Sequence, residues 1–142
     1  LALTGATTPE GGKPSFNLAD DEIEYGVGIH GEPGYRSEKL KPSKDLAEEL
    51  VTKLLESFEI KENETIGVFV NGMGGTPLME QYVFMNDVRA LLEDKNIDVR
   101  FKKVGDNMTS LEMQGLSLTL IKFEDEKWLE ALNAPANTIA WK

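Results

Sequence analysis

Apolar residues recur at helical spacing in two long stretches of the chain, residues 43–57 and residues 77–94. In both, the apolar positions lie three or four residues apart, which predicts amphipathic helices with one face toward the core. Ser43 is the expected N-cap of the first helix. We expect two shorter helices over residues 108–114 and 124–133. The apolar stripe of the first helix consists of Leu46, Leu50, Leu54 and Phe58, widened by Ala47, Val51 and Leu55.

Four further segments have the character of β-strands. Residues 22–29 alternate and are rich in β-forming side chains, so we expect a strand that ends at His30. Residues 65–71, "TIGVFVN", form a continuous apolar run, which indicates a strand buried on both faces. Residues 97–104 and 116–123 supply two more strands. Because strands alternate with helices, the order predicts an α/β layered domain with a mostly parallel or mixed sheet covered by helices.

Length, charge and residue usage limit the classes of function. The chain has 142 residues, the size of one ordinary domain, and carries 15 basic against 25 acidic residues, a net charge of −10. This charge repels phosphate backbones and anionic lipids, so we expect neither nucleic acid nor a membrane as a partner. With no cysteine and a single histidine, the chain is poor in zinc ligands, and we expect no metal site. We expect a soluble cytoplasmic protein.

The first residues have the character of an interrupted strand. The chain begins "LALTG", without a methionine, on apolar residues that suit the end of a strand. It then enters "ATTPEGGKPSF", whose proline and glycine content predicts a loop. We therefore expect a fragment of a longer protein.

The stretch "NGMGGTP", residues 71–77, follows the buried strand and precedes a helix, with Thr76 as expected N-cap and Pro77 as first helical residue. A glycine loop at this position presents backbone N–H groups to an anion such as phosphate. However, it lacks the lysine and the spacing of a P-loop, and it is not Gly-x-Gly-x-x-Gly. A tight strand-to-helix turn explains the same glycines and is the interpretation we favour, although both remain open.

His30 is the only histidine of the chain and lies in "GIHGEPG", where the predicted strand gives way to "GEPGYRSEKLKP", which we expect to be a loop. Sites in α/β domains often lie at such strand ends, and flanking glycines let a ligand approach the ring. The alternative is a structural histidine that hydrogen-bonds a loop carbonyl, and position alone does not decide. Glu32 is either the acceptor of the His30 Nδ1 proton, which would leave Nε2 as a lone pair, or a solvated loop carboxylate.

The stretches "GKPSFNLADDEIEYGVGIHGEPG", "VNGMGGTPLMEQYVFMNDV" and "TSLEMQGLSLTLIK" follow one another along essentially the whole chain. Together they resemble the dihydroxyacetone kinase family, specifically its dihydroxyacetone-binding K subunit or K domain. The resemblance implies that His30 holds dihydroxyacetone as a covalent hemiaminal between Nε2 and the ketone carbon. Gly31 and Glu32 are the neighbouring candidates for substrate binding.

The chemistry that the resemblance implies suits an imidazole. A lysine amine would add to a ketone and then lose water to form an imine, whereas an imidazole nitrogen has no second hydrogen to lose. The adduct therefore stops at the reversible hemiaminal. This tether would orient the hydroxyl groups for phosphoryl transfer and would reject glycerol, which has no carbonyl.

The resemblance also implies partners. Residues 1–142 would be the C-terminal, histidine-bearing domain of a K subunit whose N-terminal domain, with a second histidine and an aspartate for acid–base chemistry, is absent from this chain. The enzyme would be a homodimeric kinase subunit, more in keeping with the phosphoenolpyruvate-dependent multi-subunit type than with an ATP-dependent single chain. ADP or ATP with Mg is then expected on an ADP-carrying L subunit or a following domain, with no cofactor in this chain. The isolated fragment would be inactive.

Two other functions stay open. A non-catalytic paralogue would bind dihydroxyacetone in the same way and act as a sensor or coactivator of a transcription regulator. A structural domain would bind only protein. The residues around His30 do not separate the kinase from the sensor, because both need the same adduct.

Overall fold

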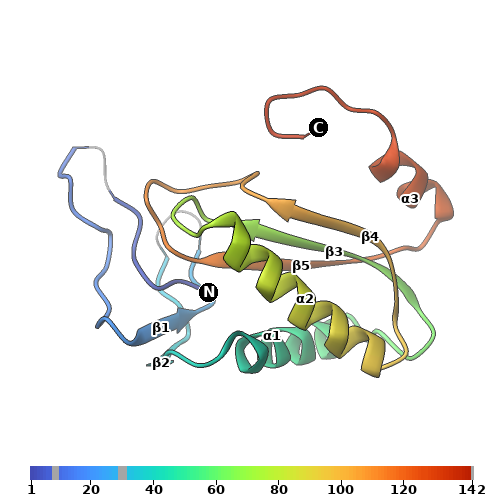
Figure 1. The fold of residues 1–142 in the computed structure, drawn as a ribbon, viewed down its shortest axis with the longest axis horizontal. Coiled ribbons are helices and arrows are strands. Elements are labelled where there is room, and N and C mark those ends of the chain that lie inside the picture. Colours follow the sequence, from blue (N-terminus) through green and yellow to red (C-terminus); the bar gives the residue numbers. More distant parts are fainter. Residues whose placement is uncertain (8–9, 29–31, 142) are drawn as a thin grey trace.

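The computed structural model describes residues 1–7, 10–28 and 32–141. Within these residues a mixed sheet of three strands carries helices, and a two-stranded hairpin lies beside it (Figure 1). The predicted α/β class with a mixed sheet covered by helices is confirmed. The elements in order are β1 (Glu22–Tyr25), β2 (Arg36–Lys39), α1 (Ser43–Ser57), β3 (Thr65–Gly72), α2 (Leu78–Asp94), β4 (Asp98–Gly105), β5 (Leu116–Lys122) and α3 (Glu126–Asn133).

Strand β3 is the centre of the larger sheet, whose order is β4-β3-β5. It pairs parallel with β4 and antiparallel with β5. Ile66, Val68 and Val70 of β3 have no exposed surface and belong to the main hydrophobic core. Phe69, which points to the other face of the sheet, is also partly shielded. The strand is apolar along its length because both of its faces are covered, one by α2 and the other by the C-terminal segment.

Helices α1 and α2 pack against each other, and α2 packs on β3 and β4. Figure 1 shows both helices on one side of the sheet, with α3 and the C-terminal segment on the other side. On that second side the ring of Trp141 stacks on Phe101 and meets Phe69 edge-on, with 6.1 Å between ring centroids in each pair. Among the residues that the structure describes, no helix is both long enough and apolar enough to cross a lipid bilayer.

The stretch predicted as one long strand followed by a loop is a short hairpin. Strand β1 ends at Tyr25 because Gly26 takes a φ of 77°, at which an extended strand cannot continue. The predicted end of the strand, at Ile29 and His30, lies outside the described residues. Strand β2 lies inside the predicted loop and pairs antiparallel with β1. Its sequence, "RSEK", is polar and largely exposed, so it lacks the apolar alternation by which strands are recognised.

The helix predicted over residues 108–114 is wrong. Glu112 takes a φ of 55°, which interrupts a right-handed helix. The segment instead lies against the glycine loop that follows β3, where the N–H of Gly75 donates to the carbonyl of Met113 at 2.9 Å. These contacts to a distant part of the chain replace the local bonds of a helix.

The glycine loop after β3 is a tight turn with much of its backbone already paired. The N–H of Met73 donates to the carbonyl of Gly115 at 3.0 Å, so the amides of Met73 and Gly75 are both used inside the protein. Gly74 has a φ of 116°, and a Cβ at this position would lie 2.5 Å from the carbonyl oxygen of Ser110. Turn geometry and close approach to residues 108–114 account for these glycines without an anion.

The two long helices do not have the N-caps that the sequence predicts. Pro42, not Ser43, precedes α1, and Pro77, not Thr76, precedes α2; neither makes a side-chain capping bond. The hydroxyl of Thr76 instead donates to the carbonyl of Gly115 at 2.6 Å and accepts from its N–H at 2.8 Å. Thr76 thus connects the start of α2 to the residue before β5.

Replacing Gly74 with alanine is expected to destabilise the fold, because the new Cβ meets a backbone carbonyl and the backbone angle disfavours any side chain. The strain alone is worth about 1–3 kcal/mol. Gly12→Ala is the matched control, since Gly12 also has a positive φ, 57°, but open space around its Cβ position. Urea denaturation should show a clearly larger loss for Gly74→Ala; equal losses for the two variants would contradict the packing described.

Candidate functional site

The candidate site residues lie in the loop of residues 26–35, which joins β1 to β2. Of the three residues predicted from the sequence, His30 and Gly31 lie outside the described residues. Glu32 is described and is exposed at the surface of the loop. The part of the site that the structure shows is therefore the two arms of this loop and the elements that hold them.

The first arm of the loop brings Glu32 back toward β1. The N–H of Gly28 donates to the carbonyl oxygen of Glu32 at 3.1 Å. The carboxylate of Glu32 lies over Gly28, because a Cβ built on that glycine would be 2.6 Å from the carboxyl carbon. A side chain at position 28 would displace the Glu32 carboxylate from this position. The predicted contact between Glu32 and His30 stays a prediction.

The second arm is bonded to β1 through backbone and side chain. The N–H of Tyr35 donates to the carbonyl of Tyr25 at 2.9 Å, and the N–H of Gly34 donates to the Glu24 carboxylate at 2.6 Å. A Cβ on Gly34 would overlap the carbonyl oxygen of Tyr25. The glycine at the end of "GEPG" is therefore required for the loop to close on β1.

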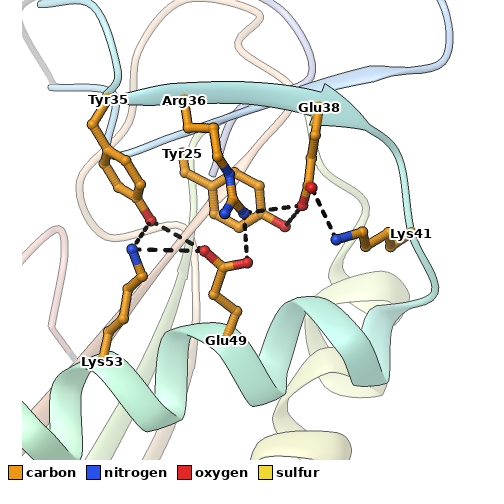
Figure 2. Close-up of polar contacts among 7 residues, drawn as sticks. All are labelled: Tyr25, Tyr35, Arg36, Glu38, Lys41, Glu49 and Lys53. Atoms are coloured by element: carbon orange, nitrogen blue, oxygen red, sulfur yellow. Dashed lines mark hydrogen bonds and ion pairs between the residues drawn. The ribbon is translucent and has the colours of Figure 1, made fainter.

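Directly after this arm, Arg36 connects the hairpin to α1 (Figure 2). Its Nη2 donates to Glu38 at 3.0 Å and to Glu49, on α1, at 2.6 Å. Its guanidinium carbon also lies 4.5 Å from the centroid of the Tyr25 ring, a cation–π contact. The pairing register explains this cluster, because Tyr25 is directly opposite Arg36 and residues two apart on a strand share a face.

Tyr25 is fully buried, and its hydroxyl donates to Glu38 at 2.8 Å. Burial, followed by this hydrogen bond to a carboxylate, raises the pKa of Tyr25 well above its usual value. The pKa of Glu38 is lowered, first by the hydrogen bond from Lys41 and then by that from Tyr25. Near neutral pH the tyrosine is therefore a neutral donor and Glu38 an ionised acceptor.

Glu49 also holds the neighbouring residue of the hairpin. It accepts a hydrogen bond from the hydroxyl of Tyr35 at 3.3 Å, while Lys53, one turn further along α1, donates to the same hydroxyl at 2.6 Å. Its hydrogen bond to Arg36 is the largest cause of the raised pKa of that guanidinium. We call this network the hairpin clamp; its members are Tyr25, Tyr35, Arg36, Glu38, Lys41, Glu49 and Lys53 (Figure 2).

The clamp matters because β2 has little else to hold it. An isolated two-stranded hairpin is marginal in water, and β2 presents mostly exposed polar side chains. Burial of Ile23 and Tyr25 anchors β1 in the core. Sequence reasoning did not find the clamp; its only signals were the spacing of Arg36 and Glu38 by two, and of Glu49 and Lys53 by four, which are common on exposed surfaces.

Near the loop, the described residues form neither a metal site nor a pocket lined by the loop itself. Among them, no three histidine, cysteine, aspartate or glutamate side chains gather as metal ligands. An apolar cavity of about 250 Å³ lies between the N-terminal segment, α1 and α2. No described residue of the loop lines it. Its walls include Leu1, Leu3, Ile23, Leu40, Leu46, Val83 and Phe84.

Comparison with known sequences gives a match over nearly the whole chain. Residues 1–140 match the family model of the Dak1 domain. The chain is 61% identical to the dihydroxyacetone-binding subunit DhaK of the PTS-dependent dihydroxyacetone kinase of Lactococcus lactis, over 99% of this chain and 42% of that protein. It is 50% identical to the DhaKLM operon coactivator DhaQ of the same organism, over 91% of this chain and 40% of that protein.

Comparison with solved structures agrees. A dihydroxyacetone kinase operon co-activator, Dha-DhaQ, superimposes with a TM-score of 0.86 and 48% identity, covering 94% of this chain and 42% of that one. The chain thus spans less than half the length of the curated relatives it matches.

Replacing Tyr25 with phenylalanine tests the electrostatics of the clamp. Because folding raises the pKa of Tyr25, the unfolded state releases this proton first, and the stabilisation is lost as the pH rises above the ordinary tyrosine value of 10.0. Tyr25→Phe should cost about 1 kcal/mol at neutral pH. It should also remove the tyrosinate absorbance that develops above the ordinary range. If the tyrosinate absorbance that Tyr25→Phe lacks, relative to the wild-type protein, develops at the ordinary tyrosine pKa, the buried hydrogen bond is contradicted.

Proposed function

This chain belongs to the Dak1 domain family, and from that premise we propose that it is the dihydroxyacetone-binding, C-terminal part of a dihydroxyacetone kinase K subunit. The observation that carries the proposal is the identity of 61% with a dihydroxyacetone-binding subunit over 99% of the chain. The motif "GIHGEPG" stands between β1 and β2 in the sequence. Its described residues support the proposal, because Gly28 is bonded to Glu32 and Gly34 to Glu24 of β1.

His30 is the proposed nucleophile. Its neutral Nε2 attacks the carbonyl carbon of dihydroxyacetone and forms a C–N bond, while the carbonyl π pair moves to oxygen. The oxygen then takes a proton and Nδ1 releases one, so that the product is a neutral hemiaminal and no water is lost. Glu32 is the proposed acceptor of the Nδ1 proton, and Gly31 leaves room for the ketone beside the ring.

Phosphoryl transfer to the tethered triose requires groups that we assign outside this chain. We propose a multi-subunit, phosphoenolpyruvate-dependent system with a homodimeric K subunit. An M subunit would rephosphorylate the ADP that an L subunit holds with Mg, and the phosphoryl group would then pass from this nucleotide to the triose. The acid–base histidine and aspartate would come from a further, N-terminal domain. The relatives are more than twice as long as the matched region, which is consistent with such a division.

The second candidate is a sensor that binds dihydroxyacetone at the same histidine and activates transcription. It is favoured by the identity of 50% with an operon coactivator and by the close superposition on a co-activator structure. A kinase converts bound dihydroxyacetone to its phosphate, whereas a sensor only binds it. Addition of an L subunit and its phosphoryl donor to the full-length protein should yield dihydroxyacetone phosphate only for the kinase.

The tether is tested by carbon NMR with dihydroxyacetone labelled at the carbonyl carbon. We expect a new signal in the region of a carbon bearing two heteroatoms, because addition converts the ketone carbon to a tetrahedral one. His30→Ala should abolish this signal, while Asp21→Asn, an exposed change at the end of the hairpin opposite the loop, should leave it. Glycerol should not compete. If the wild-type protein shows only the free ketone and its hydrate, the tether is excluded.

The tether also predicts a pH dependence. Only neutral imidazole can add to the carbonyl, so the adduct should be lost as the pH falls through the histidine pKa, whose ordinary value is about 6.5. The measurement is the dissociation constant of labelled dihydroxyacetone as a function of pH, with the His30 ring signal followed in parallel. Binding that stays constant while the ring becomes protonated would contradict addition by Nε2.

A further inference from the structure

Arg36 contacts three different parts of the molecule from one position. It lies over the buried Tyr25 ring of β1, pairs with Glu38 within β2, and reaches Glu49 on α1 at 2.6 Å. Its charge is permanent at any pH at which the protein folds. The start of β2 is thereby fixed both to β1 and to the helix.

The loop of residues 26–35 ends directly at this point. Its last two residues, Gly34 and Tyr35, donate their N–H groups to β1, and Tyr35 is also held through its hydroxyl by Glu49. Glu49 therefore holds Tyr35 and Arg36 together, two consecutive residues at the exit of the loop. Any shift of Arg36 relative to α1 is transmitted to this arm of the loop.

We propose that Arg36 and Glu49 are positioning residues, which fix the loop of residues 26–35 on α1 and so set the geometry in which its histidine can react. The identity of the ligand rests on the proposed function. The positioning of the loop is argued from the contacts of the hairpin clamp alone. Covalent addition needs near-attack geometry, and small misplacements of a reacting group cost large factors in reactivity.

The pair suits positioning better than general stabilisation. The Arg36 and Glu49 side chains are 41% and 19% exposed, and ion pairs of this kind add little to the stability of a fold. Ile23 and Tyr25 beneath them are also held by apolar burial in the core. Loss of the pair should therefore loosen the loop while the domain stays folded.

The test compares Arg36→Met and Glu49→Gln with Arg89→Met. Arg89 pairs with Glu93 at 2.7 Å on α2, and its side chain is 45% exposed, so this variant removes a similar ion pair away from the hairpin. Carbonyl-labelled dihydroxyacetone should bind at least tenfold more weakly to both clamp variants and unchanged to Arg89→Met. Thermal unfolding should shift little in all three. A double variant Arg36→Met/Glu49→Gln should lose less than the sum of the two single losses, because the two side chains share one ion pair.

A second readout needs no ligand. The single histidine gives one ring Cε1–H signal, which should change its shift or titration midpoint in the clamp variants but not in Arg89→Met. Amide exchange at Gly34 and Tyr35 should accelerate at least tenfold in the same two variants. If exchange and the histidine signal are unchanged in Arg36→Met and Glu49→Gln, the positioning role is overturned.

The two readouts separate the two proposals. A wild-type protein without adduct would refute the proposed tether, while amide exchange would still decide whether the clamp positions the loop. If the wild-type protein forms the adduct and Arg36→Met and Glu49→Gln form it equally tightly, the tether is retained and the positioning role is refuted.

Discussion

The ion pair between Arg36 and Glu49, beside the buried ring of Tyr25, is the contact on which the placement of the candidate site depends. Glu49 lies on α1, which packs on α2, which in turn covers the sheet around β3. Support thus passes from the buried sheet through two helices to the hairpin, and from the hairpin to the loop of residues 26–35. The loop carries the proposed binding motif and leads into β2, a largely exposed strand, so the placement of its second arm relies on this connection.

The sequence predicted the parts of the fold whose signal is burial. The run "TIGVFVN" became the central strand because its residues are covered on both faces, and the stripe of residues 43–57 became α1 because one face meets α2. These patterns follow from the hydrophobic effect and from element periodicity, both of which are local in sequence. The α/β class with a mixed sheet followed from them.

The sequence failed where partners are distant or polar. Strand β2 was missed because "RSEK" pairs through its backbone and shows no apolar alternation. Thr76 was expected to cap a helix, but its hydroxyl has better partners in Gly115, 39 positions away. Arg36 and Glu49 are 13 residues apart on different elements, and no short-range spacing predicts such a pair. The motif around His30 was recognised as a block, but the residues that hold its loop were not.

The proposed tether would serve a kinase and a sensor alike, because each would need the same adduct on the histidine. The difference would lie in whether acid–base groups and a phosphoryl donor meet the tethered ketone. A crystal structure of the protein soaked with dihydroxyacetone tests the central claim most directly. We predict continuous density joining His30 Nε2 to a tetrahedral carbon, with the Arg36–Glu49 pair intact. An unmodified His30 with the ketone bound elsewhere, or not bound, would contradict the account.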